Sequence, residues 1–297
     1  MKVLFVMGHG ASGSTVLGNT LGQIEGFFHP GELRTLWDEG LPGRQKCGCG
    51  LPVGECELWQ RIVKTGFGDD LDVERFGAWH REAVRVRHTL RLLRLRPGQR
   101  TGWSVLDAYA DVAARLYRAV AEVTGARVIV DTSKRAGDAA LARLLPGIDA
   151  YFVQLVRDPR ATVHSWMRRG GGSPFGATIG NWIAYAVLDE AIRMRAGRSR
   201  SLLVRHEDFV AEPRHVLERL VRLVGEWPTD LPLLDEHTVD MQPIHTMSGH
   251  WSRHASGPIE LRADTSWQAE MPPRRRLAVT AATSPFLIRY GYPVSRS

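Results

Sequence analysis

The sequence predicts an α/β fold with three layers, in which helices cover both faces of a central parallel sheet. Four short apolar stretches support this prediction: residues 3–7, 127–130, 151–156 and 202–204 each end in a polar or glycine-rich turn. Such nearly continuous apolar runs are typical of strands that are buried on both faces. Helical patterns lie between them, at 15–21, 76–95, 105–123, 136–145, 160–168, 179–195 and 214–224. Strands that alternate with helices favour a parallel sheet.

The length of 297 residues suits one large α/β domain, and we expect a single domain over 1–297. Residues 55–123 contain no convincing strand. They are predicted to form a helical insertion after the first strand–helix unit, a natural place for a substrate pocket. Residues 232–263 are rich in His, Ser, Gly and Pro and are predicted to form a long functional loop.

The composition, 43% hydrophobic and 24% charged, is that of an ordinary globular protein. The apolar residues 3–7 lead directly into a glycine-rich stretch, without the long apolar region of a signal peptide. The sequence contains no run of about 18 apolar residues, so no membrane span is predicted. We therefore expect a cytoplasmic protein without stable membrane insertion, and its many arginines fit a GC-rich bacterial genome.

The formal net charge of +7 favours a negatively charged partner, which could be a nucleic acid, an anionic lipid or a polyanionic small molecule. The basic residues are spread along the chain, and no signature of a nucleic-acid-binding module is present. We therefore expect a small anionic ligand and no nucleic acid. Arg87, Arg91 and Arg94 recur at helical spacing and predict a solvated helix face.

A glycine-rich loop follows the first predicted strand. Residues 8–15 read GHGASGST, and a helix is predicted to begin at their end. Successive backbone N–H groups in such a loop, together with the start of a helix, form an anion site. The spacing is that of a P-loop, but Ser14 stands where nucleotide hydrolases carry lysine. The loop therefore suits an anion and argues against ATPase chemistry, although a plain glycine-rich turn would show the same pattern.

A second polar turn follows the strand at 151–156. Arg157 ends the strand, Asp158 is a good N-cap and Pro159 suits the first helical position. Ligands bind at this carboxyl edge of open α/β sheets. Ser165 lies about two helical turns after the cap, on the same side. The guanidinium and the hydroxyl would together suit a phosphomonoester, whereas an ion pair between Arg157 and Asp158 is the structural alternative.

A third polar turn follows the strand at 127–130 and reads Asp131-Thr132-Ser133-Lys134. Its position predicts that Lys134 lies near the same edge of the sheet. Asp131 suits either a magnesium-binding Walker B aspartate or a simple cap.

Three cysteines lie close together at Cys47, Cys49 and Cys56. An odd number of cysteines in a cytosolic chain argues against a disulfide framework. A zinc site would need a fourth ligand, for which His29 is the nearest candidate, and the spacing matches none of the usual zinc patterns. We expect reduced thiols that pack a loop, and no metal.

These motifs, taken in order, resemble those of the P-loop-fold sulfotransferases, above all the bacterial and tyrosylprotein-type branch. Residues 11–17, ASGSTVL, are similar to the family's RSGSTLL loop, and Arg157 and Ser165 have its eight-residue spacing. Further matching segments are 31–37 (GELRTLW), 47–50 (CGCG), 56–59 (CELW), 131–134 (DTSK), 206–209 (HEDF) with Pro213, 248–253 (SGHWSR) and 290–292 (YGY). The resemblance runs from residue 1 to about residue 293.

The resemblance implies transfer of a sulfuryl group from 3′-phosphoadenosine-5′-phosphosulfate (PAPS) to a hydroxyl on a small acceptor, without a metal. Adenosine 3′,5′-bisphosphate would be the second product. Donor binding would fall to Gly10, Ala11, Ser12, Gly13, Ser14, Thr15, Arg157, Ser165, His206, Ser248, Gly249 and Arg253, the last three within the loop at 232–263.

Catalysis, by the same resemblance, would rest on Glu32 as the general base and on Lys134 as the group that stabilises the leaving oxygen. His29 and His9 are rival bases, because imidazole titrates nearer to neutral pH. Arg34 would orient Glu32 or the acceptor. Trp37, together with Trp59, Trp79 and Trp103, suits either an apolar acceptor pocket or the core.

Two departures from the family pattern concern donor binding. Ala11 stands where the family usually has Arg or Lys, and His206 replaces a tyrosine that helps to hold the adenosine. Lys134, Arg157 and Arg253 would have to supply more of the positive charge. Two alternatives stay open: a P-loop kinase, which the missing loop lysine disfavours, and a catalytically silent nucleotide-binding protein, which Glu32 and Lys134 disfavour.

Overall fold

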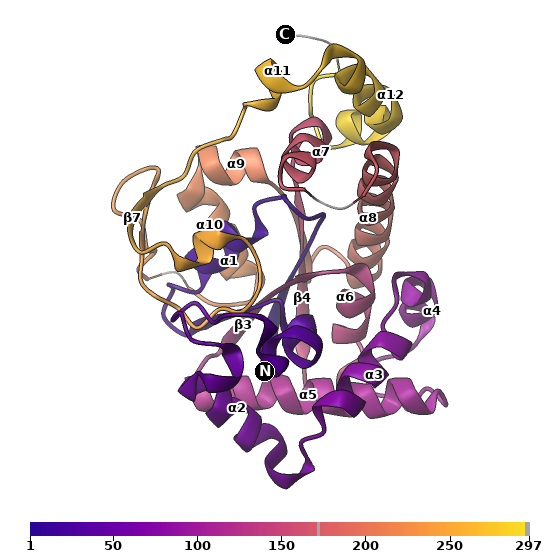
Figure 1. Cartoon of the computed structure of the whole chain (residues 1–297), viewed down its shortest axis with the longest axis vertical. Helices are drawn as coiled ribbons and strands as arrows, with labels where there is room; N and C mark the ends of the chain where they lie inside the picture. Colours follow the sequence, from indigo (N-terminus) through magenta and orange to yellow (C-terminus); the bar gives the residue numbers. More distant parts are fainter. Residues whose placement is uncertain (171–172, 228, 295–297) are drawn as a thin grey trace.

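The computed structural model describes residues 1–170, 173–227 and 229–294. Its centre is a five-stranded parallel sheet with the order β2-β3-β1-β4-β5 (Figure 1). The strands are β1 (Lys2–Met7), β2 (Phe27–Gly31), β3 (Val128–Lys134), β4 (Asp149–Val156) and β5 (Ser201–Arg205). The predicted three-layer α/β fold is confirmed.

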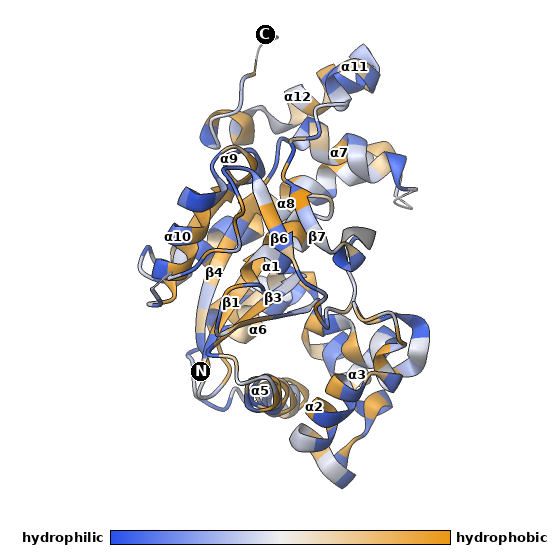
Figure 2. Cartoon of the chain, turned by 90° about the vertical axis from the view of Figure 1, so that its left-hand side faces the viewer, coloured by the Kyte–Doolittle hydropathy of each residue, from blue (hydrophilic) through white to orange (hydrophobic). Residues whose placement is uncertain are grey.

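Strand β1 shows why the sheet needs helices on both faces. Leu4 and Val6 belong to one apolar cluster, with side chains of α1 (Ser14–Leu21) and α10 (Pro213–Leu223). Val3 and Phe5 belong to a second cluster, with α5 (Ser104–Thr124) and α6 (Ala136–Ala142). Successive side chains of a strand point to opposite faces, so both faces must be covered by apolar surface. Figure 2 shows these apolar segments in the middle of the molecule.

All four predicted strands are present, and the sequence analysis missed β2. This strand is five residues long, contains Pro30 and lies at the edge of the sheet. Proline removes a backbone donor and is tolerated at sheet edges, so the segment lacks the usual pattern of a buried strand.

Six predicted helices are present, namely α1, α5, α6, α7 (Pro159–Arg168), α8 (Phe175–Ala196) and α10. The predicted continuous helix over 76–95 is wrong. It is divided into α3 (Val73–Ala83), the short η5 (Val86–His88) and α4 (Thr89–Arg94). The side chains of Arg85 and His88 donate hydrogen bonds to the carbonyls of Arg81 and Ala83, which ends α3 without a glycine or proline.

The predicted insertion contains helices and no strand. It includes η3 (Val53–Glu55), α2 (Glu57–Phe67), η4 (Gly68–Asp70), α3, η5, α4 and α5. Before it, η1 (Leu33–Thr35) and η2 (Leu36–Arg44) continue from β2. Figure 1 places α2, α3 and α5 together at the end of the molecule opposite α11 (Trp267–Glu270) and α12 (Pro273–Arg289).

The segment 232–263 is only partly irregular. It contains an antiparallel pair, β6 (Thr238–Met241) and β7 (Gly257–Glu260), and the short η6 (Trp251–His254). The sequence analysis also missed α9 (His206–Ala211). None of the described helices is long and apolar enough to cross a bilayer.

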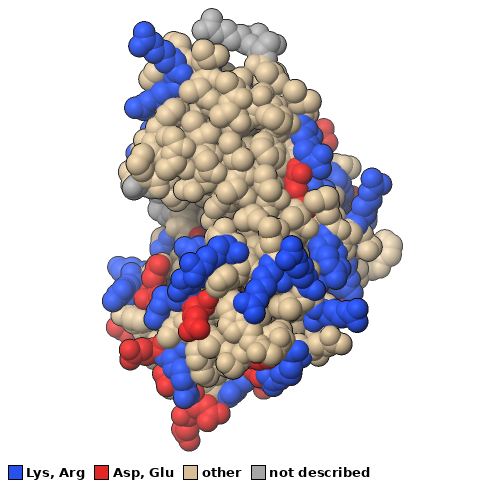
Figure 3. Space-filling view, turned by 90° about the vertical axis from the view of Figure 1, so that its right-hand side faces the viewer, with Lys and Arg blue, Asp and Glu red and all other residues tan. Residues whose placement is uncertain are grey.

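Basic side chains gather over the lower half of the side of the molecule shown in Figure 3, the side on which α3, α4 and α8 lie in Figure 1. Arg87, Arg91 and Arg94 are exposed, as expected for a solvated helix face. Arg91 also lies over the ring of Trp103, 4.2 Å from its centroid.

Candidate active site

The glycine-rich loop connects β1 to α1 and lines a cavity of about 750 Å³. Gly10, Ala11, Gly13, Ser14 and Thr15 all contribute to the lining. The helix begins at Ser14, so its free N–H groups and positive end face the same region. This loop can therefore hold an anion.

Gly13 has a structural reason to be glycine. Its φ is 91°, and a Cβ atom at this position would lie 2.4 Å from Nδ1 of His206. Ser12 is buried and, within the described part of the chain, does not line this cavity.

Glu32 directly follows β2 and lines the same cavity. Glu32 is only 6% exposed. Arg34 Nη2 donates to Glu32 Oε2 at 2.6 Å, and Lys134 Nζ donates to Glu32 Oε1. Strands β2 and β3 are parallel neighbours, so their carboxyl ends bring Glu32 and Lys134 together. Burial by itself would raise the pKa of Glu32, but the two adjacent cations outweigh it and lower that pKa. The carboxyl group is therefore ionised at neutral pH.

Lys134 has a φ of 68°, an unusual backbone conformation for a residue with a side chain. Such strain is held by the surrounding structure and is common at functional sites. Arg34 contributes to this support, because its backbone N–H donates to Ser133 Oγ and its Nε donates to the carbonyl of Ser133, both at 3.2 Å. Arg34 therefore holds the β3 turn and the carboxylate of Glu32 at once.

Asp131 has a structural position. It accepts hydrogen bonds from Tyr117 Oη and, at 2.7 Å, from the backbone N–H of Ser133. Burial raises its pKa to about 6. Among the residues described, it is not part of the cavity lining. Of the two alternatives for Asp131, this geometry favours the cap over a magnesium ligand.

Arg157 lies at the end of β4, is buried and lines the cavity. It donates to the carbonyls of Ala11 at 3.1 Å and Asp264 at 3.0 Å. Asp158 caps α7 as predicted and forms its ion pair with Arg160, at 2.7 Å, so the alternative pair between Arg157 and Asp158 is not formed. Ser165 is buried on α7 and does not belong to the described cavity linings.

A second cavity, of about 810 Å³, adjoins the first. The two cavities share Arg157, His206 and Asp264. His206 is buried, and burial together with the charge of Arg157 lowers its pKa to about 4, so the ring is neutral. Its Nδ1 atom has no hydrogen-bond partner among the described residues. This nitrogen faces Gly13, and a buried polar atom without a partner is costly.

Glu207, next to His206, connects the end of β4 to the C-terminal segment through hydrogen bonds. Its carboxylate accepts the backbone N–H of Asp158 at 3.0 Å and the hydroxyl of Tyr292 at 2.6 Å. The hydroxyl of Tyr290 accepts from Gln154 of β4 at 3.0 Å. The final YGY segment therefore supports the sheet edge at which Arg157 lies.

The segment 248–250 contacts the start of α1 and lines the cavity. Ser248 and Gly249 line it, and the backbone N–H of His250 donates to Thr15 Oγ1 at 3.1 Å. Arg253 is half-buried and donates to the carbonyl of Gly249 at 3.0 Å. In the part of the chain that the structure describes, Arg253 supports this segment and does not line the cavity.

The three remaining predicted candidates lie around the cavity, outside its described lining. His29 is buried, with Nδ1 3.0 Å from Asn19 Oδ1 and Nε2 3.0 Å from Thr132 Oγ1. Burial and the charge of Lys134 lower its pKa to about 3, so it is neutral. His9 donates from Nδ1 to the carbonyl of Gly10 at 2.7 Å when that nitrogen is protonated. Trp37 is buried in the core against Phe67 and Phe76.

Several cavity residues were missed by the sequence analysis: Arg135, Trp166, Arg169, Tyr185, Arg262 and Asp264. One signal for Arg169 was available, because it lies four residues after Ser165, directly after the end of α7. Arg262 and Asp264 come from a distant segment without a local motif.

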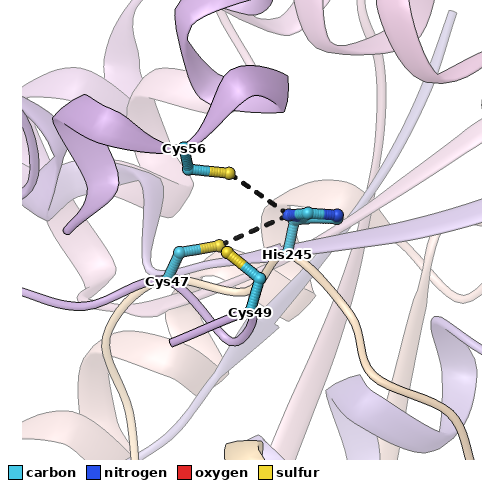
Figure 4. Close-up of side chains that lie close together, drawn as sticks. All are labelled: Cys47, Cys49, Cys56 and His245. Carbon is cyan, nitrogen blue, oxygen red and sulfur yellow. Dashed lines mark hydrogen bonds between the residues drawn. The ribbon is translucent and has the colours of Figure 1, made fainter. Parts of the chain in front are cut away.

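The histidine beside the three cysteines is His245, so His29 is wrong as the fourth member of this group (Figure 4). His245 lies 189 positions after Cys56 in the sequence, and only the tertiary structure brings the two together.

The fold and the cavity define an α/β protein with a glycine-rich loop and a cavity at the carboxyl edge of a parallel sheet. The chain belongs to the sulfotransferase family, whose sequence model matches residues 60–229, more than half of its length. This confirms the resemblance found in the motifs. The matched region includes Lys134, Arg157 and His206, whereas the glycine-rich loop and Glu32 precede it.

Two solved structures have a similar fold. The sulfotransferase domain from the olefin synthase of Synechococcus PCC 7002 is 22% identical with a TM-score of 0.57, and the match covers 99% of this chain and 95% of that chain. The sulfotransferase domain from the curacin biosynthetic pathway is 17% identical with a TM-score of 0.56, and the match covers 99% of both chains. At these identities the likeness is one of fold.

Proposed function

We propose that this sulfotransferase uses PAPS as its donor and a hydroxyl group of a small molecule as its acceptor, with Glu32 as the general base. One observation carries the proposal: the buried carboxylate of Glu32, paired with Lys134 and Arg34, lies in the same cavity as the anion-binding loop.

The charge of the cavity suits a ligand with several anionic groups. Two acidic side chains, Glu32 and Asp264, contribute to its described lining. The cationic side chains there are Arg34, Lys134, Arg135, Arg157, Arg169 and Arg262. A phosphosulfate with a separate 3′-phosphate would match this excess of positive charge.

The two adjoining cavities also suit the size of a nucleotide donor. We infer that the loop and Lys134 hold the phosphosulfate, while Arg157, at the boundary, contacts the nucleotide phosphate. The neutral ring of His206, which lines both cavities, would contact the nucleoside. This would give His206 a role comparable to that of the tyrosine it replaces.

Arg169 offers a solution to the missing charge at Ala11. It lines the same cavity as Ala11, and the positive charge of Arg157 contributes to lowering its pKa, after the larger effect of burial. Two guanidinium groups near each other repel, and a bound dianion would relieve this repulsion. We infer that Arg169 supplies the charge that the loop lacks.

The pairing of Glu32 suggests how the base becomes active. PAPS, when bound, supplies a sulfuryl group on a phosphate that leaves readily. Lys134 would exchange its contact with Glu32 for the leaving oxygen, which frees Oε1, while Arg34 continues to hold Oε2. Loss of the adjacent positive charge would raise the pKa of Glu32 and make it a better base. The carboxylate would then accept the acceptor proton late, as the O–S bond forms.

A pocket of about 430 Å³ on the insertion side is our candidate for the acceptor. It shares Arg34 and Arg135 with the donor cavity, and Asp38 and His80 also line it. These polar groups favour a hydroxylated metabolite. Two structural relatives come from an olefin synthase and from the curacin biosynthetic pathway, which supports a role in specialised metabolism. Trp37 and Trp59 are core residues and do not support an aromatic acceptor pocket.

Ligand-induced stabilisation tests the donor without knowledge of the acceptor. Adenosine 3′,5′-bisphosphate at about 100 times its dissociation constant should stabilise the fold by about 2.7 kcal/mol. A melting shift of a few degrees is expected at this chain length. ATP with magnesium should give a smaller shift, because the loop lacks its lysine and ATP has no 3′-phosphate.

A larger shift with ATP and magnesium would contradict the donor assignment and favour the kinase. A shift with the bisphosphate but no transfer of radiolabelled sulfate to a broad panel of alcohols and phenols would favour the silent nucleotide-binding protein.

A further inference from the structure

The cluster of Cys47, Cys49, Cys56 and His245 lies outside the donor cavity. Its three Sγ atoms and one imidazole nitrogen all lie within 4.8 Å of one another (Figure 4). Nδ1 of His245 is 3.6 Å from Sγ of Cys47 and 3.2 Å from Sγ of Cys56. Cys47 and Cys56 are buried, whereas Cys49 is exposed.

The two sulfur–nitrogen distances are close to those found between the ligands of a bound zinc ion. Zinc–sulfur bonds of about 2.3 Å and zinc–nitrogen bonds of about 2.0–2.1 Å, at tetrahedral angles, place sulfur and nitrogen about 3.6 Å apart. Three thiolates and one imidazole form a standard ligand set for a structural zinc ion, and soft thiolates disfavour magnesium and calcium. We propose that this chain binds one Zn²⁺ ion through Cys47, Cys49, Cys56 and His245.

The backbone around the cluster holds the two distant segments in register. Gly48 N–H donates to the carbonyl of Thr246 at 2.8 Å, and Trp59 Nε1 donates to the carbonyl of His245 at 3.1 Å. A Cβ atom on Gly48 would lie 2.0 Å from the carbonyl oxygen of Ile244, so only glycine permits this approach. The ligands are therefore arranged by contacts that do not depend on the metal.

The role of the ion is structural, since four protein ligands leave no open position for a substrate. It joins the start of the insertion to the segment that lines the donor cavity. Met247, two residues after His245, donates to the carbonyl of Pro30 at 2.9 Å and accepts the N–H of Glu32 at 3.2 Å. The next residues, Ser248 and Gly249, line the cavity. The zinc ion would thus fix the position of this segment relative to Glu32.

Metal analysis of the purified full chain tests this site independently of any activity. Protein produced in zinc-supplemented medium and passed over a desalting column should contain about one zinc per chain by mass spectrometry of metals. Cys56→Ser and His245→Asn should each lose most of it. His254→Asn is the matched control, because His254 is exposed and its Nδ1 lies 3.4 Å from the carbonyl of Gly48, beside the cluster but outside it. It should retain the metal.

The wild-type chain provides a second measurement, in case the variants fail to fold. Replacement of zinc by Co²⁺ should give the visible absorption of tetrahedral cobalt with thiolate ligands, and a strong chelator should lower the melting temperature by several degrees. The proposal would be overturned if wild-type protein contained less than about a tenth of a zinc per chain, had three freely titrating thiols and showed no change in melting temperature with the chelator. A disulfide between two of the cysteines, or full zinc retention by folded His245→Asn, would also overturn it.

Discussion

The replacement Glu32→Gln separates the proposed base from its structural surroundings. The amide keeps the size of the side chain but cannot take a proton. Its single oxygen can accept a hydrogen bond from Lys134 or from Arg34, and its NH2 group then faces the other cation. Loss of a positioned general base should lower kcat by about 10²–10⁴. This corresponds to a rise of about 3–5 kcal/mol in the activation free energy, at about 1.4 kcal/mol for each factor of ten.

The same change also removes the counter-charge of two largely buried cations. The side chains of Lys134 and Arg34 are 13% and 20% exposed. Breaking a buried ion pair costs about 3–5 kcal/mol of folding free energy, and this partial exposure places the expected cost at or below the lower end. Donor binding should be unchanged or tighter, because Lys134 no longer interacts with a carboxylate.

Glu226→Gln is the matched control for loss of a carboxylate that is paired with two cations. Glu226 accepts from Lys2 at 2.7 Å and from Arg127 at 3.0 Å, and it is not part of the described donor-cavity lining. This variant should lose some stability and keep kcat. The assays are transfer of radiolabelled sulfate, calorimetry with adenosine 3′,5′-bisphosphate and thermal unfolding. Folded Glu32→Gln with kcat within a few-fold of wild type would refute the role of Glu32 and make the buried His29 the next candidate to test.

Three further predictions concern donor binding and pH. Arg157→Ala should weaken binding of adenosine 3′,5′-bisphosphate by about 1.5–3 kcal/mol, the value of a charge-assisted hydrogen bond. Ser165→Ala should have less effect. Calorimetry should compare the binding of the bisphosphate with that of its 3′-dephosphorylated form. If Arg157→Ala weakened the binding of both ligands equally, Arg157 would not contact the 3′-phosphate. Arg169→Ala should weaken binding of the bisphosphate by at least tenfold. Arg168→Ala should not, because Arg168 is not part of the described cavity lining, and equal effects would remove Arg169 from the site. In the folded protein His29 has a pKa of about 3 and stays neutral, whereas in the unfolded chain its imidazole binds a proton below about pH 6.5. The contribution of His29 to the folding free energy is therefore complete above that pH. This contribution falls by about 1.4 kcal/mol per pH unit as the pH decreases from there. Urea unfolding at pH 7, 6 and 5 should show that the unfolding free energy of His29→Gln decreases less with pH than that of wild type.

The local patterns of the sequence were sufficient for most of the fold. The strand at residues 3–7 is buried on both faces, and its continuous apolar character expresses this directly. The cap at Asp158 and the start of α7 at Pro159 depend only on neighbouring residues. Strand β2 was missed because Pro30 and its edge position remove the pattern that marks central strands.

The candidate site was likewise predicted only in part from the sequence. Glu32, Lys134 and Arg157 each follow a strand, so their place at the carboxyl edge of the sheet could be inferred from the sequence. Their contacts could not, because parallel pairing of β2 with β3 decides that Glu32 meets Lys134. Packing also decided which side chains of α7 line the cavity, since among the residues described Trp166 contributes to the lining and Ser165 does not.

The cysteine cluster shows the limit most clearly. The sequence by itself determined three cysteines in one short loop, because they lie within ten residues of one another. Only the tertiary structure decided that His245 completes the group. The segment that carries His245 is held by backbone hydrogen bonds to residues near β2, and contacts between segments so far apart in the chain leave no periodicity or spacing in the sequence.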